Sequence, residues 1–312
     1  MGFLILTLTV NPAIDHTVTA DRLVFEDRAY ITSTSESAGG RGINASCVIH
    51  SFGVETVAIV TSGGPAGVRL ERFLSGCGFS VEAVPIREEI RTNLTITDKQ
   101  GLTVKLNELG PHMDKEELGR LEQAVLAKLD RAEWLMLCGS LPPGAPANYY
   151  ARLIEAARKK KVKTLLDTDG DALLEGIEAK PSAVHANQGE AERLLSTALL
   201  TRAHFLNAAR RLRAMGAGAV ILSLGSRGAV GVDGKRAFEA QPPAIDAVCP
   251  IGAGDAMAAA FVWAMVTKKG FVEALRWGVA AGTASARLPG LRFASLAETA
   301  EIRERVEVRE VT

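Results

Sequence analysis

Residues 250–265 read Pro250-Ile251-Gly252-Ala253-Gly254-Asp255 followed by AMAAAFVWAM, a glycine-rich turn that opens directly into an apolar helix. The first N–H groups of such a helix lack intrahelical acceptors, and the helix dipole adds positive potential there, so the turn can bind an anion. Asp255 could accept a proton from a hydroxyl while these amides stabilise a transferring phosphoryl group. The alternative is a tight turn followed by an ordinary acidic residue at a helix N-terminus.

The rest of the chain alternates short apolar runs with helical patterns. Runs such as 3–10 and 133–140 are strand-like, whereas 114–130 and 147–161 have helical spacing. This alternation predicts an α/β fold with a mostly parallel central sheet and helices on both faces. Because ligands bind beyond the carboxyl ends of such strands, we expect the site among the residues that follow them. These residues are 11–15, 63–64, 139–140, 167–170, 187 and 225–228.

Residues 93–107, NLTITDKQGLTVKLN, alternate apolar and polar side chains around a turn at 98–101 and predict a hairpin with one apolar face. Two strands alone are marginally stable in water, so the extended stretch 14–36 is expected to add strands. Segments 14–36 and 88–107 would then form a small sheet that projects from a single domain, 1–312, as a lid and as a homodimer contact. The alternative is an antiparallel extension of the main sheet.

Composition limits the partners. The 36 Lys and Arg residues balance 36 Asp and Glu residues, so net charge gives no reason to expect nucleic acid or a membrane as partner. Cys47, Cys77, Cys138 and Cys249 show neither CxxC pairing nor metal-ligand spacing and are interpreted as buried or incidental thiols in a reducing compartment. The start, MGFLILTLTVNPAID, has no basic leader, so we expect a first strand of a cytoplasmic protein.

Ten motifs in order resemble the ribokinase (PfkB) family of sugar kinases, and most closely its 1-phosphofructokinase and tagatose-6-phosphate kinase branch. The match runs from Thr7 to about Leu296. The motifs are TLTVNPAIDHTV, SAGGRGINAS at 37–46, TSGGPAG at 61–67, RTNLTI at 91–96, LNELGP, CGSLPPG at 138–144, DTDGDAL at 167–173, ANQGEAERL, SLGSRGAV and PIGAGDAM. The resemblance implies a three-layer ribokinase-like fold and favours a catalytic Asp255.

The resemblance also implies transfer of the γ-phosphoryl group of ATP, with Mg²⁺, to a primary hydroxyl. Asp255 would be the general base, and the N–H groups of Gly252, Ala253 and Gly254 would hold the phosphoryl group, since small residues permit close backbone approach. The favoured substrate is fructose 1-phosphate, which would give fructose 1,6-bisphosphate. The alternatives are tagatose 6-phosphate, fructose 6-phosphate, an unphosphorylated sugar or nucleoside, and a catalytically silent sugar-phosphate-binding protein.

Sugar hydroxyls would be bound by Asp15, Asn44 and the backbone of Gly39 and Gly40, because carboxylate and amide groups suit a polyol. Without the resemblance, Asp15 could serve a turn and Asn44 could cap a helix. The substrate phosphate would be bound by Arg91, whose fork matches a phosphate. Further candidates near the phosphate are Arg28, Arg41 and Ser140.

Asn187 and Glu190 match the family's N-x-x-E pattern, which organises Mg²⁺ through water and orients the nucleotide phosphates. Without the family, Glu190 would be an ordinary acid in a first helical turn. Ser223, Gly225 and Gly228 would shape the ribose and phosphate site, with Gly252 and Gly254 beyond them. The segment 280–285 would flank the adenine.

Several positions depart from the usual pattern of the branch. Arg41 replaces a lysine, and His185 with Ala186 replaces Lys-Pro, which exchanges a permanent cation for a group that is mostly neutral at pH 7. Cys249 and Pro250 replace a polar pair before the turn. If the missing lysine contacts nucleotide phosphates, ATP affinity or turnover is expected to be lower, but the retained Asp255 predicts an active kinase.

Overall fold

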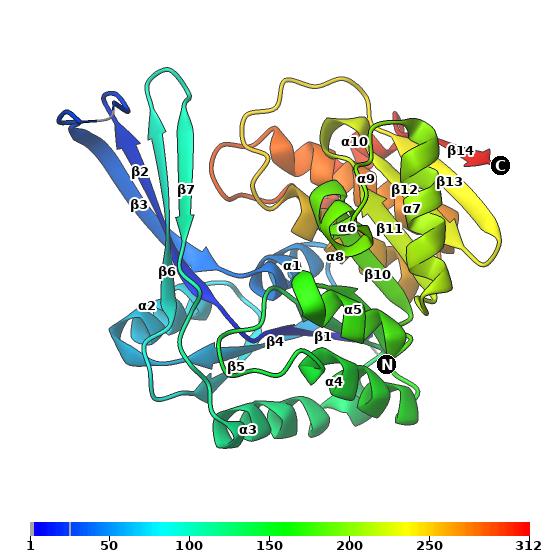
Figure 1. Cartoon of the computed structure of the whole chain (residues 1–312), viewed down its shortest axis with the longest axis horizontal. Helices are drawn as coiled ribbons and strands as arrows, with labels where there is room; N and C mark the ends of the chain where they lie inside the picture. Colours follow the sequence, from blue (N-terminus) through cyan, green and yellow to red (C-terminus); the bar gives the residue numbers. More distant parts are fainter. Residues whose placement is uncertain (1–2, 25) are drawn as a thin grey trace.

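A ten-stranded sheet runs through the computed structural model, which describes residues 3–24 and 26–312 (Figure 1). The strand order is β14-β13-β12-β11-β10-β9-β8-β1-β4-β5. Pairing is parallel from β5 to β11 and antiparallel from β11 to β14. The strands are β1 (Leu4–Thr9), β4 (Glu55–Ser62), β5 (Ser80–Pro85), β8 (Trp134–Cys138), β9 (Lys163–Asp167), β10 (Ala183–Asn187), β11 (Ala219–Ser223), β12 (Ala229–Asp233), β13 (Arg236–Gln241) and β14 (Glu307–Val311).

Helices cover both faces of this sheet, because each buried strand sends alternate side chains to opposite sides. In β1, Leu4, Leu6 and Leu8 join one apolar core while Ile5 joins the other. The first core lies under α2 (Gly64–Ser75), α3 (Lys115–Leu126), α4 (Tyr149–Lys159), α5 (Gly170–Glu178), α6 (Gln188–Leu195) and α7 (Arg202–Ala214). The second lies under α1 (Arg41–Ser51), α8 (Ala253–Val266), α9 (Phe271–Ala286) and α10 (Leu296–Arg303). The predicted three-layer α/β fold is confirmed.

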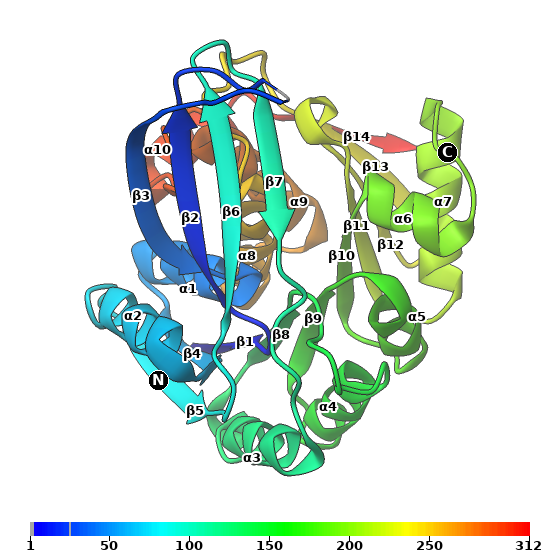
Figure 2. The ribbon, with the colours of Figure 1, turned by 60° about the vertical axis from the view of Figure 1, so that its left-hand side comes forward.

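A second, four-stranded sheet stands away from the main sheet and has the order β3-β2-β6-β7 (Figures 1 and 2). Its strands are β2 (Ala13–Ala20), β3 (Ile31–Gly39), β6 (Arg91–Asp98) and β7 (Thr103–Asn107). The predicted hairpin is confirmed as β6 and β7, and it belongs to a separate sheet rather than to an edge of the main one. Residue 25 of the predicted segment 14–36 lies outside the described residues.

The register of the parallel strands aligns their carboxyl ends. Thr9, the last residue of β1, is opposite Cys138, the last residue of β8, and Cys138 is opposite Asp167 at the end of β9. Asn187 is likewise opposite Ser223. The residues that follow these strands therefore meet at one edge of the sheet, close to the start of the small sheet. None of the helices among the described residues is long and apolar enough to cross a membrane.

Candidate active site

Asp255 lies in the first turn of α8, where α8 packs against α1. The buried Asn44 on α1 donates from Nδ2 to Oδ2 of Asp255 at 2.7 Å. Asn44 is thus inside the helix and does not cap it, since α1 begins after Gly40. Burial, and secondarily the charge of Asp167, raise the pKa of Asp255 to about 7, and the Asn44 hydrogen bond partly opposes this. A carboxylate with that pKa suits general-base chemistry near neutral pH.

The turn before Asp255 is tight, as its glycines predicted. Gly252 has a φ of 79°, in the left-handed region, and a Cβ there would lie 2.9 Å from Leu291 Cδ1. Among the described residues, the N–H groups of Gly252 and Gly254 have no backbone acceptor. Ala253 differs from the prediction, because its N–H donates to the Pro250 carbonyl at 3.2 Å and so closes the turn. The glycine amides remain for an anion.

Arg41 contacts acidic side chains in this structure. Its guanidinium bonds Asp167 at 2.7 Å, Glu190 at 3.0 Å and Asp169 at 3.2 Å. Burial would lower the pKa of Arg41, but Asp167 and Glu190 outweigh it and raise it. Arg41 thus offsets the negative charge of these three carboxylates, and its predicted contact with a substrate phosphate stays a prediction.

His185 is buried beside these acids. Its Nδ1 is 3.3 Å from Oδ2 of Asp167, in ion-pair range but not aligned as a hydrogen bond. Burial favours the neutral ring, yet Asp167 outweighs it, so the pKa of His185 is raised. Burial would also raise the pKa of Asp167, but His185 and Arg41 hold it well below its ordinary range. A Cβ on Gly254 would approach His185 Cε1 at 3.4 Å, so the imidazole lies beside the anion-binding turn.

Asp15 lies on β2, the first strand of the small sheet. Its Oδ1 accepts from Asn93 Nδ2 on β6 at 2.9 Å, and burial raises its pKa. A Cβ on Gly39 would come within 2.5 Å of the Asp15 carboxyl group, so Gly39 leaves room for that side chain. Asn93 was not singled out by the sequence reading, although it lies within the RTNLTI motif. Its buried Oδ1 has no partner among the described residues.

Arg91 is half-buried at the start of β6. Its Nη1 donates to the Glu108 carbonyl and its Nη2 to the Asn11 carbonyl, both at 3.0 Å. The buried Nε has no partner within the described part of the chain. Burial lowers the pKa of Arg91, but a guanidinium stays charged and keeps three N–H donors beyond these two bonds. Ser140 lies close by, because its Oγ is 3.4 Å from Nδ2 of the buried Asn11.

Asn187 and Glu190 form a capping box at the start of α6. Asn187 Oδ1 accepts from the Glu190 N–H at 2.9 Å, and Glu190 Oε2 accepts from the Asn187 N–H at 2.8 Å. Asn187 is exposed, whereas Glu190 is buried and also holds Arg41. Across the described residues, no group of three or more His, Cys, Asp or Glu side chains could hold a metal ion directly. These residues would therefore hold Mg²⁺ through water rather than as direct ligands, and the exposed Asn187 is the side chain that would bind such a water.

Of the predicted nucleotide residues, Ser223 ends β11, and Gly225 and Gly228 lie in the turn that follows it. Gly225 and Gly228 both have positive φ, 61° and 89°. A Cβ on Gly228 would lie 2.0 Å from the Ala240 carbonyl oxygen, so only glycine fits that turn. The segment 280–285 is part of α9, and most of its side chains are buried.

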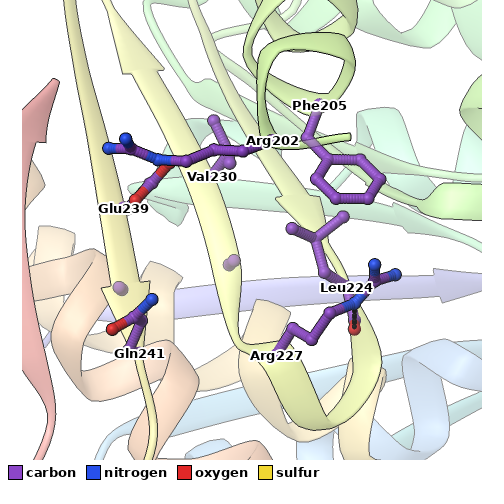
Figure 3. Close-up of a pocket in the computed structure, with 9 residues that line it drawn as sticks. Arg202, Phe205, Leu224, Arg227, Val230, Glu239 and Gln241 are labelled. Atoms are coloured by element: carbon purple, nitrogen blue, oxygen red, sulfur yellow. Dashed lines mark hydrogen bonds and ion pairs between the residues drawn. The ribbon is translucent and has the colours of Figure 1, made fainter. Parts of the chain in front are cut away.

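A cavity of about 180 Å³ lies beside this turn (Figure 3). Arg202 and Phe205 of α7, Leu224 and Arg227 of the turn, and Glu239 and Gln241 of β13 line it. Neither Asp255 nor any of the predicted substrate residues lines it. The cavity therefore does not coincide with the predicted catalytic residues.

Arg28 is not brought together with the other predicted residues. It is exposed on the loop from β2 to β3, whereas Asp15 is near the start of β2. The loop from β2 to β3 lies at the end of the small sheet that points away from the main sheet (Figure 1). Gly40, in contrast, lies next to the site: its φ is 144°, and a Cβ would meet Thr9 Cγ2 at 2.7 Å. A role for Arg28 in this site stays a prediction.

Known proteins are similar to this chain in both fold and sequence. Residues 8–298 match the family described as pfkB family carbohydrate kinase. The chain is 30% identical over 301 residues to the ATP-dependent 6-phosphofructokinase isozyme 2 of Escherichia coli (strain K12), covering 96% of this chain and 97% of that one. It is 31% identical over 311 residues to the 1-phosphofructokinase of Rhodobacter capsulatus, covering 97% and 98%. A crystal structure of Escherichia coli phosphofructokinase-2 in complex with potassium superposes with a TM-score of 0.91 at 29% identity, covering 98% of this chain and 99% of that one.

Proposed function

Because the chain belongs to the pfkB family of carbohydrate kinases and is an ATP-dependent sugar phosphate kinase, we propose that it phosphorylates a ketohexose monophosphate, with fructose 1-phosphate as the first candidate. The observation that carries the proposal is Asp255, a carboxylate with a pKa near 7 beside unpaired amides at a helix start. The product would be fructose 1,6-bisphosphate.

In this mechanism the substrate hydroxyl lies against Asp255 and loses its proton to the carboxylate as the new P–O bond forms. The bond between the γ-phosphorus and the bridging oxygen of ATP breaks in the same transfer, and ADP leaves. Asn44 keeps Oδ2 oriented through its 2.7 Å hydrogen bond. The N–H groups of Gly252 and Gly254 stabilise the charge that develops on the transferring phosphoryl oxygens. We give Ala253 no direct contact with the phosphoryl group, because its N–H already donates to the Pro250 carbonyl and closes the turn.

Polar atoms without partners support a sugar phosphate as the substrate. Among the described residues, Arg91 Nε, Asn11 Oδ1 and Asn93 Oδ1 are buried without a hydrogen-bond partner. The Arg91 Nε–H is a donor that suits a phosphate oxygen, whereas the two amide oxygens are acceptors that suit sugar hydroxyls. Buried polar groups in folded proteins are normally paired, so atoms of this kind at a sheet edge fit a polar ligand. We assign the sugar hydroxyls to Asp15 and Asn93 and the phosphate to Arg91 with Ser140.

Mg²⁺ would be held by the nucleotide phosphates and, through water, by Asn187. When bound, the ion neutralises phosphate charge and aligns the γ-phosphoryl group. Glu190 fixes the Asn187 backbone through the capping box and keeps Arg41 in place. Ser223, Gly225 and Gly228 would hold the ribose and phosphates.

A homodimer through the small sheet would complete the assembly. On that sheet and its turn, Ile31, Leu102, Val104 and Leu106 are 68%, 56%, 40% and 54% exposed, which is unusual for large apolar side chains on one sheet. A second copy of the sheet would cover them and could bring its exposed Arg28 toward the substrate. Light scattering of the purified protein tests this, and a monomer at assay concentrations would remove Arg28 from the site.

The decisive experiment measures ADP release from Mg-ATP with fructose 1-phosphate, fructose 6-phosphate, tagatose 6-phosphate and the free sugars. We expect turnover on one phosphorylated ketose, with no comparable rate on free sugars. A preference for a free sugar or nucleoside would leave Arg91 with a structural role. ATP binding without turnover on any of them would favour a silent sugar-phosphate-binding protein.

A further inference from the structure

Two thiols that are far apart in sequence meet at the sheet edge opposite the active site. Cys47 is in α1, before β4, and Cys77 is in the segment between α2 and β5. Because β4 and β5 are parallel neighbours, the connections that enter them lie at the same edge. The side chains confirm this: His50 and Phe79 pack with ring centroids 6.0 Å apart, and a Cβ on Gly78 would lie 2.8 Å from His50 Nε2.

The two thiols differ in pKa, and this difference suits thiol–disulfide exchange. The Cys77 thiol, partly open to solvent, donates to the Phe73 carbonyl at 3.4 Å. The neighbouring Cys47 thiol lowers the pKa of Cys77 to about 7, whereas Cys77, together with burial, raises the pKa of Cys47. An accessible low-pKa thiol beside a second thiol is the arrangement of redox-responsive cysteine pairs.

We propose that Cys47 and Cys77 are a thiol–disulfide modification site whose oxidation lowers the turnover of the enzyme. With a small disulfide such as oxidised glutathione, the Cys77 thiolate attacks one sulfur and releases one glutathione thiolate. Cys47 then loses its proton and attacks the Cys77 sulfur, which forms the Cys47–Cys77 bond and releases the second glutathione. The protein loses two electrons and two protons, and one disulfide becomes two thiols.

The link to turnover is α1 itself. An S–S bond is roughly 2.05 Å long, so sulfurs in non-covalent contact must move more than about 1 Å closer to form it. Asn44, one turn before Cys47 on the same helix, orients Asp255 at 2.7 Å. A displacement of about 1 Å at a reacting centre can lower the rate by up to 10²-fold. The exposed glycines Gly76 and Gly78 can absorb part of the movement. We therefore expect kcat to fall only roughly threefold to tenfold.

The test incubates the full chain with oxidised glutathione and follows intact mass, a peptide map and kcat. The wild type is expected to lose two hydrogen atoms, to yield a peptide linking Cys47 to Cys77, and to regain kcat on addition of dithiothreitol. Cys47→Ser should stop at one glutathione adduct on Cys77, whereas Cys77→Ser should leave Cys47 reduced. The matched control Cys249→Ser, which removes a half-buried thiol outside the pair, should still form the linkage.

Several outcomes would overturn the proposal. A stable glutathione adduct on wild-type Cys77 would show that Cys47 cannot resolve it, and four free thiols after treatment would show that neither reacts. A linked protein with unchanged kcat would refute the coupling through α1. The mass measurement needs no kinase substrate, so its result stands apart from the success or failure of the proposed function.

Discussion

Replacing Asp255 with Asn tests the centre of the mechanism, because the variant keeps the shape and the hydrogen-bond acceptor for Asn44 but cannot take a proton. We expect kcat to fall by roughly 10²- to 10⁴-fold, the usual contribution of a positioned general base. Binding of ATP and sugar phosphate should change little, since neither is assigned to the carboxylate's charge. Steady-state rates with isothermal titration of both ligands measure the two effects separately.

Asp255→Asn should also change how the free energy of unfolding depends on pH. Folding raises the pKa of Asp255 from an ordinary 3.8 to about 7. The folded state therefore favours the protonated group. The unfolded chain ionises from about pH 4, whereas the folded group stays protonated up to about pH 7, so this group lowers the stability progressively over that range, by up to about 4 kcal/mol at and above pH 7. Asp255→Asn removes that cost, so the variant should be more stable than wild type at pH 8, with the difference vanishing toward pH 4. Urea unfolding at several pH values measures it.

The wild type should show the matching kinetic profile. Since the base must be ionised, kcat should rise with pH and level off above about 7. The reasoning is refuted if Asp255→Asn turns over at the wild-type rate, or if its stability relative to wild type falls as the pH rises. Asp255→Glu serves as the control for geometry, because it retains the charge but moves the carboxylate.

Four further changes probe the surroundings of Asp255. Asn44→Ala removes a hydrogen bond that lowers the Asp255 pKa, so the acidic limb of the pH–rate profile should move to higher pH. Arg91→Ala should raise KM for the sugar phosphate by at least tenfold while leaving KM for ATP unchanged, and an unaltered sugar KM would remove the phosphate assignment. Arg41→Ala leaves the buried Glu190 without its cation and the buried Asp167 with His185 alone, and it should cost about 3–5 kcal/mol in chemical denaturation, whereas a loss below 1 kcal/mol would contradict the ion-pair argument. Gly252→Ala forces a left-handed φ and a 2.9 Å approach to Leu291, so stability should fall by about 1–3 kcal/mol together with kcat, as denaturation and rates on one sample would show.

The sequence predicted most of the main architecture, because strongly apolar segments report burial directly. β1 and α8 are examples, and the alternating hairpin β6–β7 also formed as predicted. The helix α9 was not predicted: its small residues give a weak periodic signal, and α9 is defined by packing against α8. The strand β13, RAFEAQ, is short and mixed, and it is defined by its pairing with β12 and β14.

The sequence predicted which residues belong to the candidate site better than it predicted their contacts. Motif residues such as Asp255 and Asn44 do meet in the structure, but the motifs could not show which side chains from distant parts of the chain contact them. Arg41 carries the charge suited to a phosphate, yet its three acidic partners lie 126 to 149 residues further along. The contact between Cys47 and Cys77 was hidden too, since no short spacing marks a pair brought together by neighbouring strands.

The long reach of these contacts has a consequence for how activity arises during folding. Asn44 and Asp255 are separated by 211 residues, and Arg41 and Glu190 by 149. Contacts with such large sequence separation form late, because closing the intervening loops costs entropy before they can contribute. Recovered turnover after dilution from denaturant should therefore lag behind the return of helical circular dichroism. An N-terminal fragment still emerging from the ribosome would lack the base entirely, so catalysis would report the completion of the whole chain.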